Sequence, residues 1–305
     1  MTGLSVLIPT FNDECLSLVR TLQAQCEALT GGITGYGALR YEIIVADDGS
    51  TDADVRETNS AVALLPHCTY MAREANVGRA AIRNLLARKA SFDRLLFIDS
   101  DMTVVRKDYI YNYVRERGDG CVVYGGYDVP QQRAMEHNLR YRYERACRHA
   151  HTTEKRRQNP YLDFHTSNFM IPKRMMMEHP LDEHFRHYGY EDVAFGRELQ
   201  RAGIEIRHID NPMGFCRLED NENFLRKTEE SIRTLAEFSG QLHNYSRLLQ
   251  LAGKIDRYHL SGLARIMLKP AAKPLRKALV GQDAPIAFLN LYKLILLLEI
   301  EKHTV

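Results

Sequence analysis

The sequence predicts an α/β protein built on a doubly wound, mostly parallel sheet with a helical C-terminal extension. Three apolar runs support this prediction, at residues 4–8, 42–46 and 94–98, and each run ends in a polar turn. Short apolar runs that alternate with helical patterns are typical of βαβ units, in which helices cover both faces of a parallel sheet. The 305 residues, with 45% apolar content, are enough to bury a substantial core.

Charge and cysteine usage narrow the possible partners and the compartment. A formal net charge of +2 is too small to indicate a nucleic-acid-binding protein, so any basic patch must be local. The six cysteines lie far apart without a CxxC pair, which favours free thiols in a reducing compartment over a zinc site or a disulfide framework. Residues 1–3 lead directly into the first apolar run and leave no room for a signal peptide. We therefore expect a cytoplasmic protein.

Polar clusters follow the three predicted strands, at residues 9–13, 47–50 and 99–101. The carboxyl ends of parallel strands share one edge of a sheet, and ligands of open α/β sheets bind at that edge. We therefore expect the three clusters to face one ligand. In the second cluster, Asp47 and Asp48 offer acceptors for a ribose or a base, while Gly49 permits a tight turn; an ordinary Asx-turn is the alternative.

A helix is predicted to begin at residues 76–79, before apolar residues at helical spacing from Ile82 onward. Backbone N–H groups of Asn76 and Gly78, together with the Arg79 fork, would suit phosphate oxygens, and a plain N-cap is the alternative. A second helix is predicted over residues 189–203, with acidic residues in its first turn.

The third cluster carries two carboxylates two residues apart, Asp99 and Asp101. On an extended segment they can point the same way and share one divalent cation, which would neutralise a diphosphate. The same residues also match the DxDxT pattern of haloacid-dehalogenase phosphatases, in which Asp99 would be a covalent nucleophile. That motif belongs on the first strand of its fold, and no GDxxxD motif follows here.

Two regions of the chain are basic. Residues 131–157 hold eight Lys or Arg and three Glu, which indicates either a solvated helix face or a site for an anionic acceptor. Residues 254–277 hold seven Lys or Arg and one Asp, and the apolar stretch 288–300 follows them. As a helix that stretch rises roughly 20 Å, short of a bilayer core of about 30 Å, so we do not expect it to span a membrane. Contact with an anionic membrane surface, packing onto the body and dimerisation all remain open, and the Pro-punctuated residues 270–285 are expected to be a joint.

Together these segments resemble glycosyltransferase family 2, whose members have the GT-A fold. The resemblance covers residues 4 to about 235, and the order and spacing of its motifs make it specific. The matching segments are residues 5–12, 45–52, 76–84, 97–101, 167–174 and 185–192. The resemblance implies a Rossmann-like GT-A catalytic domain over residues 1–235 and a helical extension, basic and then apolar, over residues 236–305.

The resemblance also implies roles for individual residues. The donor nucleotide would be held by Pro9, Phe11, Asp47, Asp48, Asn76, Gly78, Arg79 and Asp99. Asp101, with Asp99, would bind Mn²⁺ or Mg²⁺. Ser167 and Asn168 would contact the donor sugar or the acceptor, and Asp192, with Glu191 beside it, would be the general base. Many relatives supply a metal-binding His after the last strand, but residues 212–217 contain none, and His208 is expected to be a strand residue.

The implied reaction is inverting transfer of a sugar from a nucleoside diphosphate sugar, with a UDP-sugar favoured, to an acceptor hydroxyl. The acceptor would be a glycan or a lipid-linked molecule in polysaccharide or glycoconjugate synthesis, at the inner face of the membrane. The donor sugar and the linkage do not follow from these residues. The alternatives are the phosphatase, a nucleotidyltransferase, which normally has a Gly-rich basic loop after its first strand, and a non-catalytic nucleotide-sugar binding protein.

Overall fold

The computed structural model describes residues 2–32, 37–116 and 119–300. Its main sheet has seven strands in the order β3-β2-β1-β4-β7-β6-β8, and all neighbours run parallel except β7, which is antiparallel to β4 and β6. The strands are β1 (Thr2–Thr10), β2 (Leu39–Asp47), β3 (Cys68–Ala72), β4 (Arg94–Ile98), β6 (Val122–Tyr124), β7 (Asn168–Pro172) and β8 (Ile206–His208). A separate antiparallel pair joins β5 (Met102–Val104) to β9 (Met213–Phe215).

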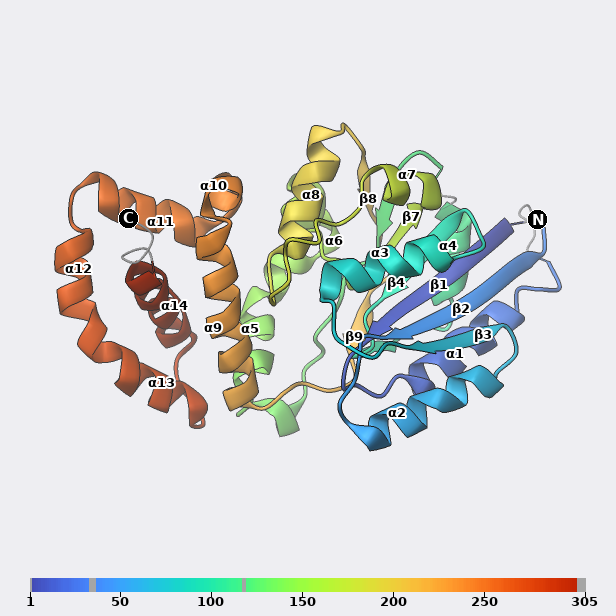
Figure 1. Cartoon of the computed structure of the whole chain (residues 1–305), viewed down its shortest axis with the longest axis horizontal. Coiled ribbons are helices and arrows are strands. Elements are labelled where there is room, and N and C mark those ends of the chain that lie inside the picture. The colour runs from blue at the N-terminus through green and yellow to red at the C-terminus, as the bar shows by residue number, and fades with distance from the viewer. Residues whose placement is uncertain (1, 33–36, 117–118, 301–305) are drawn as a thin grey trace. The chain divides into compact units, whose positions relative to one another are not determined.

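Helices cover both faces of the main sheet (Figure 1). Residues of β1 alternate between the two cores: Val6 and Ile8 pack with α1 (Leu16–Glu27) and α4 (Tyr109–Glu116), whereas Leu7 packs with α3 (Arg79–Lys89). The second core also contains residues of α7 (Lys173–Glu178) and α8 (Glu191–Arg201). The expected doubly wound, mostly parallel sheet is thus confirmed. Its central strands are apolar on both faces, and helices on each side bury those faces.

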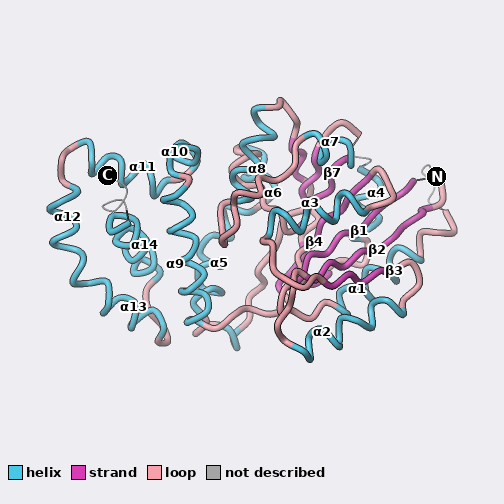
Figure 2. The backbone as a smooth tube through the Cα atoms, viewed as in Figure 1, coloured by secondary structure: helices cyan, strands magenta, loops and turns pink. Residues whose placement is uncertain are grey.

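The remaining helices of the first half of the chain are short. After β9 the chain is almost entirely helical, and Figure 2 shows these helices joined by loops. The remaining helices are α2 (Ala53–Ser60), η1 (Ala61–Leu64), η2 (Arg133–Met135), α5 (Leu139–Cys147), η3 (Arg148–His151), α6 (Thr153–Gln158), α9 (Asn221–Glu237), α10 (Ser239–Leu242), η4 (His243–Tyr245), α11 (Arg247–Arg257), α12 (Ser261–Leu268), η5 (Lys269–Ala271), α13 (Ala272–Val280) and α14 (Ile286–Ile300). In the part of the chain described, none of the helices combines the length and apolar character needed to cross a membrane.

The chain forms two compact units. The first comprises residues 1–128, 150–186 and 195–217, and contains the sheet; the second comprises residues 129–149, 187–194 and 218–305, and is helical. The helical unit thus takes three separate segments of the chain, beginning well before residue 235. The catalytic domain of residues 1–235 stays a prediction, because compactness does not decide which residues catalysis requires.

The helical unit has its own apolar core. Leu225 of α9, Leu279 of α13 and Leu289 of α14 are all fully buried in it. The apolar stretch predicted over residues 288–300 therefore packs within this unit, chiefly against α9 and α13. The expectation of a joint at residues 270–285 is wrong for residues 272–280, because these form α13 and bury Leu275 and Leu279.

Candidate active site

The ends of β1 and β2 are joined directly. Asn12, which follows β1 with a positive φ of 52°, donates its backbone N–H to Ser50 Oγ at 2.8 Å. Its side-chain oxygen accepts the backbone N–H of Thr51 at 2.8 Å and that of Asp52 at 3.0 Å. Beside this junction Phe11 is 46% exposed, whereas Pro9 is buried in β1. The first two predicted clusters therefore meet, as the parallel pairing of their strands requires.

The Asp48 carboxylate fastens the loop that precedes α3. Its two oxygens accept the backbone N–H groups of Val77 and Gly78, each at 3.0 Å. Gly49, at φ +77°, lets this loop approach, because a Cβ there would lie 2.7 Å from the backbone carbon of Ala75. Burial raises the pKa of the Asp48 carboxyl, against the opposing effect of the two N–H donors.

Asp47 also has a structural role. Its Oδ1 accepts the backbone N–H of Ser50, three residues further along the turn, at 2.7 Å, and its Oδ2 accepts the hydroxyl of Tyr70 at 2.6 Å. Tyr70 lies on β3, a strand that the sequence analysis did not predict. Asp47 is 0% exposed, so its carboxylate shapes the turn around it and does not reach the surface.

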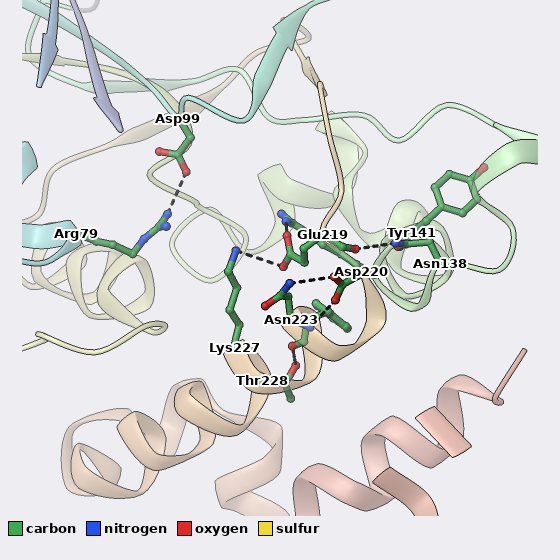
Figure 3. Close-up of polar contacts among 11 residues, drawn as sticks. Arg79, Asp99, Asn138, Tyr141, Glu219, Asp220, Asn223, Lys227 and Thr228 are labelled. Atoms are coloured by element: carbon green, nitrogen blue, oxygen red, sulfur yellow. Dashed lines mark hydrogen bonds and ion pairs between the residues drawn. The ribbon is translucent and has the colours of Figure 1, made fainter. Parts of the chain in front are cut away.

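The third cluster is tied to α3 by ion pairs. Asp99 Oδ2 lies 3.0 Å from Nη2 of Arg79, as Figure 3 shows, and Asp99 Oδ1 is bound by Nη2 of Arg83. The Arg83 side chain is only 2% exposed, whereas that of Arg79 is 40% exposed. Two guanidinium groups thus bind one carboxylate at the start of α3, and the partly exposed Arg79 fork is of a kind that suits a phosphate. The sequence analysis did not single out Arg83, because an arginine within a predicted helix gives no sign that its side chain will be buried.

Asp101 lies in the turn between β4 and β5. Its carbonyl accepts the backbone N–H of Cys216 at 2.8 Å, which links this turn to the end of β9. The described residues contain no group of three or more His, Cys, Asp or Glu that could enclose a cation. Because Mg²⁺ and Mn²⁺ bind nucleotides through one or two carboxylates plus phosphate oxygens, Asp101 fits such a cation, while both oxygens of Asp99 already face arginines.

Residues 167 and 168 behave differently. The Ser167 hydroxyl is buried and finds no hydrogen-bond partner among the described residues, and the Ser167 carbonyl accepts the N–H of Asp99 at 3.0 Å. Asn168 is fully buried: its oxygen accepts the hydroxyls of Tyr109 and Tyr113, and its nitrogen donates to the carbonyls of Gly126 and Asn211. The expected contact of the Asn168 side chain with a sugar is therefore not supported, because both its donors and its acceptor are occupied. Asn168 is the first residue of strand β7.

Four rings gather where β6 continues toward β9. Tyr127 donates to or accepts from Nε2 of His151 at 3.0 Å, and its ring lies 5.7 Å from that of His165 and 5.3 Å from that of Phe215. Burial lowers the pKa of His151 to about 4, so its ring is neutral at pH 7. We call these residues the ring cluster. The sequence analysis missed it because its members come from four distant segments.

The acidic pair begins α8. Glu191 is buried, and Asp192 accepts the backbone N–H of Val193 at 2.8 Å. The preceding turn is held by α9, since Glu230 accepts the N–H of Tyr188 at 3.1 Å and a Cβ at Gly189 would lie 2.7 Å from Cβ of Ser231. The predicted helix over residues 189–203 is confirmed, and the roles of the two acids stay predictions.

The basic stretch 131–157 is not a simple solvated face. In the helical unit, Arg140 pairs with Glu219, and Arg142 and Arg145 donate to the carbonyls of Ala284 and Val129. In the sheet unit, Arg156 is 3% exposed and donates to several carbonyls at the end of β6 and beyond β8. His208 is a buried strand residue, as expected, with Nδ1 facing Arg156 and Nε2 facing the Pro160 carbonyl.

The sequence was compared with known protein families. The model of the family described as Glycosyl transferase family 2 matches residues 5–185, which is more than half of the chain. The chain belongs to glycosyltransferase family 2. It is a glycosyltransferase by family, and the phosphatase and nucleotidyltransferase alternatives are set aside.

Two chondroitin synthases are among the relatives of this glycosyltransferase. One, from Pasteurella multocida, is 26% identical over 247 residues, which cover 70% of this chain and 24% of that protein. The other, from Escherichia coli, is 25% identical over 248 residues, which cover 70% of this chain and 34% of that protein. The chain thus spans about a quarter to a third of the length of these relatives.

A solved structure supports the expected GT-A fold. The glucosyl-3-phosphoglycerate synthase of Mycobacterium tuberculosis superposes with a TM-score of 0.50 at 17% identity, over 78% of this chain and 80% of that chain. That crystal structure contains Mn²⁺, UDP and glucosyl-3-phosphoglycerate. At this identity the likeness concerns the fold.

Proposed function

We propose that this glycosyltransferase transfers a sugar, with inversion at the anomeric carbon, from a UDP-sugar to a hydroxyl of a glycan or lipid-linked acceptor. The observation that carries the proposal is the convergence of Asn12, Asp48 and Asp99 on one edge of the sheet, through direct bonds with the loops around them. The GT-A neighbour that contains UDP makes UDP the first nucleotide to test.

In this proposal the donor lies along the carboxyl edge of the parallel strands. Phe11 is exposed enough to offer its ring face to the base. Asp47 and Asp48 act through the backbone that they hold, which includes the N–H groups of the loop formed by Asn76, Val77 and Gly78. Arg79 places a cation beside the diphosphate, and its partner Asp99 keeps the guanidinium in position.

Mn²⁺ or Mg²⁺ would be held by Asp101, with the diphosphate supplying further oxygens. When bound, the cation supplies positive charge for the phosphate oxygen on which negative charge develops as the sugar departs. The arginines at the start of α3 add to that positive charge. Electrostatic stabilisation of the transition state is usually the largest contribution to catalysis.

Asp192 is proposed to remove the proton from the acceptor hydroxyl, and one in-line displacement then forms the new glycosidic bond. Adjacent helical residues diverge by about 100°, so Glu191 and Asp192 cannot both face the same acceptor. The buried Glu191 is assigned to holding the helix start, and the less buried Asp192 to the chemistry. The ring cluster offers apolar faces against which a sugar ring of the donor or acceptor packs.

The names of the two chondroitin synthases favour a role in polysaccharide synthesis. A glycan or lipid-linked acceptor would place the enzyme at the inner face of a membrane, with the helical C-terminal region as its contact.

The test is thermal-shift binding of UDP, GDP and several nucleotide sugars, each with Mn²⁺ and with a chelator. We expect UDP with Mn²⁺ to stabilise the chain by about 2.7 kcal/mol at a hundredfold excess over Kd, through mass action. Asp101→Ala should lose the metal-dependent part of this shift. Stabilisation by GDP alone would mean that the donor is a GDP-sugar and not a UDP-sugar. Equal thermal shifts with Mn²⁺ and with chelator would contradict the assignment of Asp101 as a metal ligand.

A further inference from the structure

The helix α12 (Ser261–Leu268) carries a row of exposed apolar side chains, while Leu268 at its end is partly packed against the core of the helical unit. None of its eight residues is fully buried, although five of the eight are apolar. Leu263, Ile266 and Met267 are 56%, 76% and 68% exposed, and Leu260, just before the helix, is 48% exposed. The spacing of these residues is i, i+3, i+6 and i+7, which places them on one helix face. Proteins rarely expose a contiguous apolar face without a partner for it.

Basic residues flank α12 in the sequence, on the neighbouring helices α11 and α13. Residues 247–281 contain eight Lys or Arg and a single acid, Asp256. Asp256 accepts the hydroxyl of Ser261, and Arg276 is neutralised by Glu222 and Glu229. Of the other cations, Lys254, Arg257, Lys273 and Lys277 are exposed and form no ion pair with the described acids. Their charge is therefore available to an external anion.

We infer that α12 docks on an anionic lipid bilayer, with Leu263, Ile266 and Met267 inserted at the level of the headgroups and the surrounding lysines and arginines on the lipid phosphates. Figure 1 shows α11, α12 and α13 in succession around α14 within the helical unit. An interfacial helix lies in the membrane plane with its apolar face down and basic residues at the headgroups. The exposed apolar residues of α12 and the exposed cations of α11 and α13 supply these two components.

Two other occupants fit less well. A second copy of the chain would bring its own unpaired lysines and arginines against these, and like charges oppose such a pairing. The longer apolar helix α14 is not available for a membrane, because Leu289, Ile295 and Leu298 are buried among its neighbours. The inference makes the proposed membrane contact specific to α12, and it does not depend on which sugar is transferred.

The experiment is cosedimentation of the full chain with vesicles of phosphatidylcholine alone and with phosphatidylglycerol added. We expect binding to the anionic vesicles only, weakened by salt, and reduced about tenfold or more by Ile266→Asp and by Lys254→Gln with Lys273→Gln. The matched controls are Leu64→Asp, at a side chain 85% exposed in the sheet unit, and Lys89→Gln with Lys107→Gln, both at exposed lysines. The controls should bind as the wild type does.

Equal binding by wild type and Ile266→Asp would overturn the inference, as would binding that ignores lipid charge. So would a wild-type molar mass of a dimer by light scattering that falls to a monomer in Ile266→Asp without any vesicle binding, since α12 would then be a contact between copies. The thermal shift with UDP should be the same in all of these variants. If UDP gives no thermal shift with the wild-type protein, the proposed donor is contradicted, whereas the vesicle-binding result is unaffected.

Discussion

Arg83 and Asp99 form an ion pair between α3 and the end of β4, with the arginine side chain 2% exposed and the carboxylate 15% exposed. Arg79 binds the same carboxylate from a position that is 40% exposed. One acid therefore has a buried partner and a solvated one, and the two should respond differently to substitution.

We predict that Arg83→Met lowers the free energy of unfolding by about 3 kcal/mol, because it leaves Asp99 without its buried partner. Arg79→Met should cost less than about 1 kcal/mol, since a solvated ion pair contributes little, yet it should weaken nucleotide binding. Urea denaturation and nucleotide titration of both variants measure these effects. Equal stability losses in the two variants would contradict the distinction between them.

Asp48→Asn should loosen the loop before α3. An amide nitrogen cannot accept a hydrogen bond, so either the N–H of Val77 loses its acceptor, at a cost of about 1–3 kcal/mol, or the N–H of Gly78 keeps only Oδ1 of Asn76. Because this loop is proposed to contact the nucleotide, UDP affinity should fall as well. Asp220→Asn is the matched control, since Asp220 caps α9 by accepting the N–H of Asn223 (Figure 3). The control should leave UDP affinity unchanged.

Asp192→Asn should lower kcat by about 10²–10⁴-fold if Asp192 is the general base, while nucleotide binding stays intact. Glu191→Gln should have a smaller effect on kcat and a larger one on thermal stability, because Glu191 is buried at the start of α8. Steady-state kinetics and thermal unfolding of both variants provide the test. A greater loss of kcat in Glu191→Gln would exchange the two roles.

Stability should fall in mild acid because of His208. Burial lowers the pKa of this side chain from 6.5 to about 4, and Arg156 lies at its Nδ1. The unfolded chain therefore takes up the proton first, so stability present above pH 6.5 is lost as the pH falls toward 4, by up to about 3 kcal/mol. His208→Gln keeps an N–H donor without titrating in this range. Its unfolding free energy should depend less on pH between these limits, and an unchanged dependence would rule out His208 as the source.

The strands that position the site were the most predictable part of the fold. Residues 94–98 form β4 as predicted, because the buried residues 95–98 of this strand are all apolar. The meeting of Asp48 and Asp99 with the start of α3 also followed, since the ends of parallel strands share one edge.

Partnerships between distant residues could not be predicted. The sequence does not indicate that Asp48 would hold the N–H groups of Val77 and Gly78, nor that Arg83 would face Asp99. The antiparallel strand β7 was missed because its five residues lie within segment 167–174, which was interpreted only through its resemblance to a sugar-contacting motif. The helical unit was predicted as helices, but its composition from three chain segments depends on packing that has no local signal.

The Asn168 side chain has a consequence for how this enzyme can change its donor. A carboxamide whose oxygen serves two tyrosines and whose nitrogen serves two carbonyls has no isostere: aspartate lacks the donors, and leucine lacks every polar atom. A saturation library over residues 165–168 should consequently return folded variants with altered donor preference at His165 and Ser167, and almost none at Asn168. A change of donor sugar during evolution would then require substitutions at the neighbouring positions, while Asn168 itself stays unchanged.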